Sequence, residues 1–455
     1  MRAFGRCRYL LPQRRCQRTG RYDANAQACW GACMTVRAGA EVVTPISRGA
    51  VAVVGNAQSV HVRARAAALQ TLGYQVTLIT SQKVEGVACL QASLEDYVVP
   101  TKRWGKLGAR IAKLRAVVSI FARHRGEATH IHYAQGLWAG LGFILGARPL
   151  IVTVMGGDIL FGEQVSSSWA DRALTKLLLR NADLVTAKSE HLARVVRSFG
   201  VSERKVMVLY WGVDTAAFRP IDGVPLRRKL GLSPDDLVLL SPRFLKPLYN
   251  VHNIVEALPL IRARGHKARL LVIDYGAEPA YRAQVLRRAG ELGLAEDVIL
   301  LPPRPREQMP EIYAASDVVV SVPSSDGMPM TVLEAMACGK PTVVTDLQHY
   351  RELFLDGENV ITCSTTAEGI AQAVGRLATQ PELTSRLVEN ALKTVAERAD
   401  LRSELARLNE RLVEIVDGHR RRQPLAVRVL AFLLLVLAAL QQAVRSSLKA
   451  SPRAV

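Results

Sequence analysis

Two carboxylates stand eight positions apart in the segment SSDGMPMTVLEAMACG, which runs from Ser324 to Gly339. Asp326 belongs to a Gly/Pro loop, and Glu334 follows in TVLEAMA, a strong helix former. The loop offers backbone N–H groups and the helix start offers partial positive charge, which together favour a phosphate group. Carboxylates beside such a site are good acceptors for hydroxyl groups. The segment therefore predicts a ligand that is part phosphate and part polyol, such as a sugar nucleotide; the alternative is an ordinary junction whose acids only cap the helix.

A cation for the same ligand is predicted in SPRFLKPLYN, where Arg243 follows an apolar run that reads as a strand. Open α/β sheets bind ligands outside the carboxyl ends of their strands. The planar guanidinium group suits a diphosphate because it makes bidentate contacts and stays charged. Lys246 is a second candidate, provided that the loop bends toward the phosphates.

The elements that must position these residues follow an α/β pattern. Strand and helix signals alternate from about residue 49 and restart near Leu237, which predicts two strand-first, doubly wound units with parallel sheets. Pro220 and Gly223 interrupt the pattern between the two units. The expected strands fall within 50–55, 74–80, 130–133, 149–158, 182–189, 205–214, 237–243, 268–274, 297–302, 317–322 and 340–346.

The composition fits two domains with basic ends. The chain has 455 residues, 49% of them hydrophobic, and a net charge of +20. Much of the excess charge lies in the first 33 and the last 38 residues, and the apolar run beside the latter favours lipid over nucleic acid as the partner. We expect a basic extension over 1–47, domains over 48–219 and 220–417, and a tail over 418–455. Met34 is a candidate for the true start, because residues 1–33 read so unlike the rest.

The seven cysteines do not form a disulfide pattern, and no secretory segment opens the chain, so a reduced, cytoplasmic setting is expected. A zinc site from the first four cysteines is an alternative, but their spacings match no common zinc pattern. The H-x-H pair formed by His130 and His132 suits a metal only in part, since no third ligand stands nearby. No metal and no cofactor are predicted. The four N-terminal cysteines are Cys7, Cys16, Cys29 and Cys33.

Several segments together resemble the retaining glycosyltransferases of the GT-B fold, family 4 (glycosyl transferases group 1). The paired acids resemble the E-x7-E motif of that family, with Asp326 in place of the first Glu. YWGVDTAAFRP resembles a family signature in which Trp211 replaces Asn. Relatives carry a Lys at the place of Tyr249, so this part of the match is broken. The resemblance covers roughly residues 48–415, and its motifs occur in the family's order.

The resemblance implies two Rossmann-like domains facing a cleft and the transfer of a sugar from a nucleoside diphosphate donor, with retention of the anomeric configuration. Glu334 would hold the ribose. Asp326 would hold the donor sugar and steady the oxocarbenium-like centre, with Arg243 as the third catalytic residue. The residues expected to contact the donor are Gly55, Asn56, Arg243, Lys246, Asp326, Gly327, Met328, Pro329, Met330, Thr331 and Glu334.

The first domain is expected to bind the acceptor, a saccharide or a lipid-linked saccharide. Three residues are candidates for this side: His61 near the first loop, His132 at the end of a strand, and Asp158 in VTVMGGD. For each of them a plain structural role is the alternative, such as a surface histidine or a turn acid. Two other functions stay open, a sugar-nucleotide epimerase and a non-catalytic sugar-nucleotide-binding partner of a membrane assembly.

The C-terminal tail predicts attachment to the cytoplasmic face of a bacterial inner membrane. Twelve uninterrupted apolar residues, Val429 to Leu440, are too few to span a bilayer, which needs about 20. At 100° per residue, larger apolar side chains dominate one side of the helix. The opposite side is a stripe, with Leu435 as its main intruder, formed by Arg428, Ala431, Ala438, Gln442, Arg445 and Lys449. This pattern favours a helix in the interface, with basic ends on anionic headgroups, over a single span. A tail packed on the protein is the third alternative.

Overall fold

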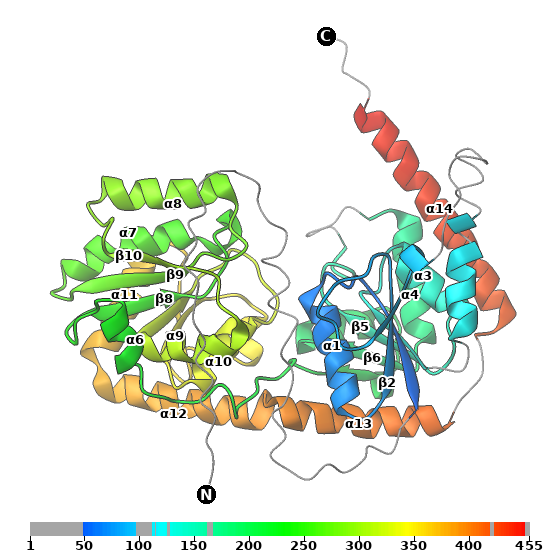
Figure 1. The fold of residues 1–455 in the computed structure, drawn as a ribbon, viewed down its shortest axis with the longest axis horizontal. Coiled ribbons are helices and arrows are strands. Elements are labelled where there is room, and N and C mark those ends of the chain that lie inside the picture. Colours follow the sequence, from blue (N-terminus) through cyan, green and yellow to red (C-terminus); the bar gives the residue numbers. More distant parts are fainter. Residues whose placement is uncertain are drawn as a thin grey trace, which may run out of the picture.

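The computed structural model describes residues 49–96, 112–113, 115–124, 128–161, 167–418 and 423–450. They form two α/β domains side by side, each built on one parallel sheet (Figure 1). The two-domain GT-B prediction is therefore confirmed. The extension over 1–47, with its four cysteines and Met34, lies outside the described residues, whereas Cys89, Cys338 and Cys363 are free thiols.

The first sheet has seven strands in the order β3-β2-β1-β4-β5-β6-β7, and all its pairings are parallel. Its central strands are short apolar runs buried on both faces, as a sheet covered by helices on both sides requires. The strands are β1 (Ala50–Val54), β2 (Gln75–Thr80), β3 (Leu90–Ser93), β4 (Ala128–His132), β5 (Leu150–Val154), β6 (Leu184–Ala187) and β7 (Val206–Val208).

Helices cover this sheet, and their ends follow local sequence signals. The helix α4 begins after Ser168, whose side chain forms a reciprocal capping box with Asp171. The helix α5 begins after Ser189, whose hydroxyl accepts from the N–H of Leu192 at 3.2 Å. The helices of this domain include α1 (Val60–Thr71), α3 (Leu137–Leu145), α4 (Trp169–Asn181) and α5 (Glu190–Ser198), with 3-10 turns η2 (Leu94–Asp96) and η3 (Glu203–Lys205). Residues 115–123 are helical as well.

The second sheet has six parallel strands in the order β10-β9-β8-β11-β12-β13. Its strands are β8 (Leu237–Ser241), β9 (Ala268–Ile273), β10 (Val298–Leu301), β11 (Val318–Ser321), β12 (Thr342–Thr345) and β13 (Ile361–Cys363). Its helices are α6 (Val224–Lys229), α7 (Val251–Arg262), α8 (Pro279–Glu291), α9 (Met309–Ala315), α10 (Met330–Ala337), α11 (Ala367–Thr379) and α12 (Pro381–Arg398), with 3-10 turns η4 (Pro247–Tyr249), η5 (Arg306–Gln308) and η6 (Tyr350–Glu352).

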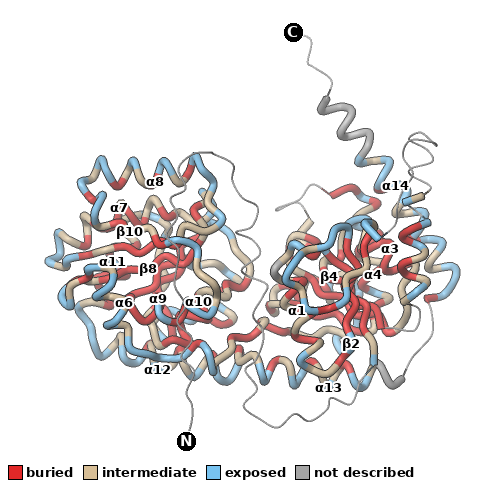
Figure 2. The backbone as a smooth tube through the Cα atoms, in the orientation of Figure 1, coloured by how far each residue is buried: buried red, intermediate tan, exposed pale blue. Residues whose placement is uncertain are grey.

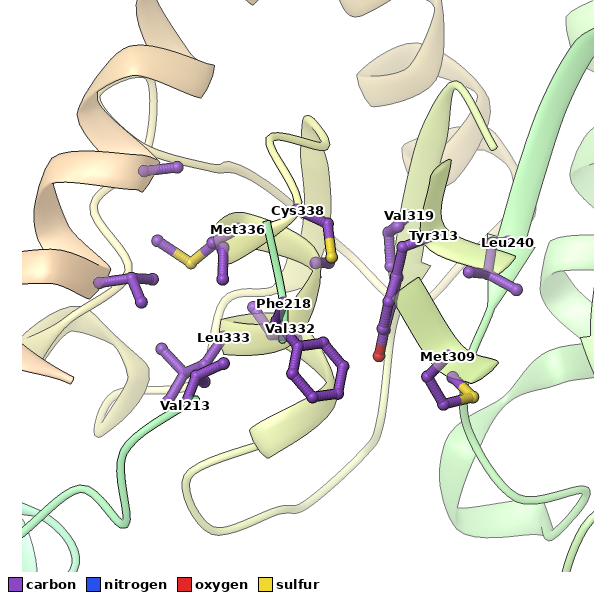
Figure 3. Packing of buried hydrophobic residues seen from close by; sticks show 14 of the residues in the cluster. Val213, Phe218, Leu240, Met309, Tyr313, Val319, Val332, Leu333, Met336 and Cys338 are labelled. Carbon is purple, nitrogen blue, oxygen red and sulfur yellow. The ribbon is translucent and has the colours of Figure 1, made fainter. Parts of the chain in front are cut away.

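Both sheets are buried inside their domains, and the exposed residues lie on the outer helices (Figure 2). One core cluster of the second domain joins α9 and α10 to the chain that arrives from the first domain. There the ring of Phe218 meets that of Tyr313 at 6.3 Å between centroids, beside Val332 and Leu333 (Figure 3). The helix that carries Glu334 is thus fixed by apolar packing on its inner side.

The chain crosses between the domains twice, and the two crossings touch. The N–H of Val213 donates to the carbonyl of Ala399 at 2.7 Å, and the N–H of Leu401 donates back to Val213 at 2.9 Å. A Cβ on Gly212 would lie 2.4 Å from Cα of Leu401, so only glycine fits there. After the second crossing, α13 (Leu401–Gly418) runs along the first domain, where Leu408 packs in its core (Figure 1). Residues 401–417, expected in the second domain, thus pack on the first.

The tail forms one helix, α14 (Leu425–Ala450), which packs on α3 and α4 of the first domain. Ala431 is fully buried there, Leu435 packs against Gly140, and Arg428 Nε donates to the carbonyl of Ile144 at 2.8 Å. The first part of the stripe, Arg428, Ala431 and Ala438, thus faces the protein, whereas Gln442 is exposed. Among the described residues, α14 is the one helix long and apolar enough to cross a membrane.

Candidate functional site

A cavity of about 300 Å³ lies between the two domains and is lined from both sides. The first domain contributes α1 and the residues that follow β6 and β7. The second contributes the residues that follow β8, β9 and β10 and the loop that leads into α10. All these strands are parallel within their sheets, so the cavity lies at their carboxyl ends, where open α/β sheets bind ligands.

Arg243 and Asp326 form the centre of the second domain's wall. Arg243 Nη2 donates to Asp326 Oδ2 at 2.7 Å, and Nη1 donates to Thr331 Oγ1 at 3.2 Å. Asp326 Oδ2 also accepts from the hydroxyl of Tyr350 at 2.9 Å. The guanidinium group lies 4.4 Å from the ring centroid of Tyr249, the residue at the family's Lys position. The arginine is thus held flat beside the anion site predicted from the sequence, with its orientation fixed on three sides.

Glu334 lies in the same wall, one turn into α10, and is buried. Its Oε1 forms an ion pair with Arg306 Nη2 at 2.9 Å, and its Oε2 accepts from the hydroxyl of Tyr313 at 3.1 Å. Burial raises the pKa of Glu334 above its usual range, while Arg306 and Tyr313 lower it. The two carboxylates predicted from the sequence therefore line one cavity, and each is paired with an arginine.

The loop between these acids meets the cavity as expected. Met328, Pro329, Met330 and Thr331 line it, and α10 begins at Met330 without a side-chain cap. The first N–H groups of this helix are therefore available to a ligand. Gly327 is adjacent and close to the first domain.

Four predicted donor contacts do not line the cavity, namely the adjacent Gly327 and three residues farther away. Gly55 is buried, where a Cβ would lie 3.0 Å from Val62 Cγ2. Asn56 is exposed, and its Oδ1 accepts from the N–H of Gln58 at 2.9 Å, a local turn contact. Lys246 Nζ lies 5.9 Å from the ring centroid of Phe244, outside the cavity. The structure therefore does not bring these three residues into the cavity wall.

Of the three acceptor-side candidates, only His61 lines the cavity. Its ring lies 5.3 Å from that of Trp211, and burial together with Lys188 lowers the pKa of His61 to about 4. His132 packs behind Trp211 at 5.4 Å, and burial lowers its pKa well below the usual value. Both rings are thus neutral at pH 7.

Asp158 takes its alternative role, that of a turn acid. Its Oδ2 accepts from the N–H of Ala134 at 2.7 Å, and its Oδ1 accepts from the N–H groups of Met155 and Gly156 at 3.0 and 2.9 Å. The residue is fully buried. Its carboxylate therefore fixes the turn after β5, and the predicted contact with an acceptor hydroxyl is wrong.

Several cavity residues escaped the sequence reasoning. Lys188 directly follows β6, and Arg306 follows β10 within five residues. Tyr350, five residues after β12, does not line the cavity but donates its hydroxyl to Asp326 behind the wall. Trp211, noted only as a departure from the family signature, lines the cavity with a left-handed backbone at φ +73°. The signal that could have found them is their position, since polar or aromatic residues just after the strands of a parallel sheet gather at one edge.

Glu352 joins the two domains beside the cavity. Its carboxylate accepts from the N–H groups of Glu190 and His191, at the start of α5 in the first domain. A carboxylate at a helix N-terminus is stabilised by the unpaired N–H groups and the helix dipole.

No three His, Cys, Asp or Glu side chains in the described ranges gather closely enough to hold a metal ion.

Two family models match the chain, one on each domain. Residues 58–217 match the model described as Glycosyltransferase Family 4, and residues 225–394 match the model described as Glycosyl transferases group 1.

Curated relatives match one part of the chain. A D-inositol 3-phosphate glycosyltransferase of Acidothermus cellulolyticus is 31% identical over 216 residues, 46% of this chain and 48% of that protein. One from Stackebrandtia nassauensis is 32% identical over 221 residues, 47% of this chain and 50% of that protein. The chain thus spans about half the length of the curated relatives it matches.

Solved structures match both domains. Anabaena HepE in complex with UDP and glucose has a TM-score of 0.65 at 19% identity, covering 81% of this chain and 100% of that one. A glycosyltransferase from Rickettsia africae has a TM-score of 0.66 at 16% identity, covering 82% of this chain and 100% of that one. At these identities the likeness concerns the fold. With both domains matched by family models and the two-domain fold matched by these structures, the chain belongs to the group 1, family 4 glycosyltransferases.

Proposed function

We propose that this protein transfers a sugar from a nucleoside diphosphate sugar to an acceptor, with retention of configuration. The observation that carries the proposal is the wall formed by Arg243, Asp326 and Glu334 at the start of α10. It places a cation, unpaired N–H groups and two hydroxyl-accepting carboxylates within one cavity. A diphosphate and the two sugars of a sugar nucleotide need this combination.

Each residue has a role in this proposal. Arg243 and the first N–H groups of α10 stabilise the negative charge that grows on the diphosphate as the glycosidic bond breaks, without a metal ion. Asp326 accepts from the hydroxyls of the donor sugar, for which it exchanges part of its contact with Tyr350. Glu334 accepts from the ribose, and its ion pair with Arg306 opposes the rise in the pKa of Glu334 that burial causes.

Relatives support a nucleotide sugar as the donor. HepE is named in complex with UDP and glucose, and the curated relatives are named as glycosyltransferases. A thermal-shift screen of UDP-, GDP- and ADP-sugars should identify one donor that raises the melting temperature, because ligands that bind the folded state stabilise it. The bound donor is then incubated in labelled form with saccharide acceptors, with and without EDTA, and the anomeric configuration of the product is read by NMR. Epimerised donor, or binding without any transfer, would contradict the proposal.

We propose further that the protein works at the cytoplasmic face of the inner membrane on a lipid-linked acceptor. The outer side of α14 exposes Val429, Leu430, Phe432, Leu433 and Leu440, each about half exposed or more. Arginine and lysine residues flank this helix in the sequence. An apolar face between basic ends suits the interface of an anionic bilayer, with the helix lying flat on the first domain.

Outward-facing variants test this attachment without disturbing the packing of α14. Phe432→Ser together with Leu433→Ser should release the protein from sedimenting vesicles of anionic phospholipid. Val413→Ser, an exposed apolar position on α13, serves as the control and should still sediment. Truncation after Asp417 should likewise leave the protein in the soluble fraction. Equal sedimentation of the face variant and the control would rule out α14 as the attachment.

A further inference from the structure

Lys188 extends from the first domain to the loop that leads into α10 of the second. It is the first residue after β6, and it lines the cavity. A Cβ placed on Gly327 would lie 2.5 Å from Lys188 Nζ and 2.8 Å from its Cε, with no other atom within 4 Å beyond its chain neighbours. The absence of a side chain at Gly327 is therefore what admits the ammonium group to this place.

The ammonium group of Lys188 has no partner of its own in the part of the chain that the structure describes. No hydrogen bond or ion pair joins it to any of the described residues, although Asp326 and Asp158 lie close enough to raise its pKa against the lowering by burial. Asp326 is already engaged by Arg243 and Tyr350, and Asp158 by three backbone N–H groups. Lys188 is partly buried, and a cation that loses part of its water without gaining a partner is destabilised, so an anionic ligand is expected beside it.

We infer that Lys188 is a second cation for the diphosphate of the donor, supplied from the opposite domain. The inference rests on the proposed function, because it takes the nucleoside diphosphate as the ligand. Arg243 lies on one side of the loop before α10 and Lys188 reaches it from the other. The terminal phosphate, beside this loop, provides the partner that the ammonium group lacks. Lysine binds phosphate as a compact point charge and so needs no bidentate geometry.

This arrangement makes the diphosphate a bridge between the domains. Its charge is shared by Arg243 of the second domain and Lys188 of the first, so binding the diphosphate also draws the two walls of the cavity together. A nucleoside monophosphate lacks the terminal phosphate and cannot form the bridge. The contribution of Lys188 to binding should therefore appear with a diphosphate and vanish with the corresponding monophosphate.

Isothermal titration calorimetry on the full chain tests this inference. The probes are UDP, GDP or ADP, whichever the wild-type protein binds, and the matching monophosphate. Lys188→Met keeps the length of the side chain and removes its charge, and should weaken diphosphate binding about 10- to 100-fold while leaving monophosphate binding unchanged. Lys393→Met on the exposed face of α12 is the matched control and should bind both probes like the wild type.

A double-mutant cycle tests the contact itself. Gly327→Ala should weaken diphosphate binding in the wild-type background, because the new methyl group displaces Lys188, and should have a smaller effect in a Lys188→Ala background. Equal diphosphate affinity in Lys188→Met and the wild type would overturn the inference, as would an equal loss for the monophosphate. Unchanged diphosphate binding with reduced transfer would assign Lys188 to the acceptor instead. If the wild type binds no nucleoside diphosphate at all, the proposed function itself fails.

Discussion

The two walls of the cavity differ in how their charges are satisfied. In the second domain each acid already holds an arginine, Asp326 with Arg243 and Glu334 with Arg306. In the first domain the ammonium group of Lys188 has no partner among the described residues, and His61 is neutral at pH 7. The second wall is thus organised before any ligand arrives, because fixed charges need no rearrangement during the reaction. In the first wall, by contrast, we expect a bound anion to supply the missing partner of Lys188.

Among the variants that test this difference between the walls, Asp326→Ala should reduce sugar transfer the most. Asp326→Ala deletes the acceptor for the donor sugar and leaves the buried Arg243 without its ion pair. We expect kcat/KM for sugar transfer to fall about 100-fold, which corresponds to the loss of hydrogen bonds worth about 3 kcal/mol. Asp346→Ala breaks a comparable but exposed pair with Arg351 and should leave transfer unchanged. Similar activities in these two variants would show that the second wall is not the site.

Arg243→Lys should be nearly as damaging, although the charge is kept. The guanidinium group bonds Asp326 and Thr331 at once and lies on the ring of Tyr249, which a lysine cannot do. We expect a loss of kcat/KM of about 10- to 50-fold, since roughly 1.4 kcal/mol corresponds to each factor of ten. Arg351→Lys on the surface is the control. Wild-type turnover in Arg243→Lys would place the anion site elsewhere.

Glu352→Ala tests whether the walls act together. The carboxylate of Glu352 holds the start of α5 across the cavity, so its loss should loosen the contact between the domains. We expect the KM for the donor to rise about threefold to tenfold with little change in kcat, because a charged hydrogen bond at a helix start contributes about 1 kcal/mol. Small-angle scattering should show a larger radius of gyration. Glu358→Ala, an exposed neighbour, should change neither quantity.

Glu404 gives the prediction farthest from the cavity, which concerns stability and not sugar transfer. It lies on α13 beneath the crossing, and burial raises its pKa to about 7 from 4.5. The folded state therefore holds the proton more tightly than the unfolded state, so stability is greatest at low pH and falls as the pH rises from about 4.5 to 7. At pH 8 the loss is about 3 kcal/mol. Glu404→Gln should raise the melting temperature at pH 8 and leave it unchanged near pH 4; an equal gain at both values would contradict this assignment.

The sequence predicted the strands that are long apolar runs, because burial on both faces demands them. Segments such as AVAVV and LIVTV became β1 and β5 as expected. The strands β3 and β13 were not expected, since LQAS and ITC are short edge segments whose pairing depends on a neighbouring strand. Asp326, Glu334 and Arg243 were found from the sequence because one loop-to-helix motif and one strand end place them.

Only the tertiary structure decided which other residues meet the cavity. Lys188 and Trp211 line the cavity and Glu352 lies beside it, each from a separate element of the fold. No local sequence pattern indicates that residues so far apart in the chain come together. The same reason explains Asp158, whose carboxylate is taken by backbone N–H groups that come from two different strand ends.

The tail shows the same division between sequence and structure. Its sequence determined an amphipathic helix with one apolar side, because large apolar residues recur along it with the helical period of 3.6 residues. Which side meets the protein was decided by the surface of α3 and α4, where Gly140 leaves room for Leu435 and Ala431 fits closely. Shape complementarity between distant segments cannot be read from either segment alone. Local periodicity therefore determined the elements of this protein, and contacts between distant elements determined its site.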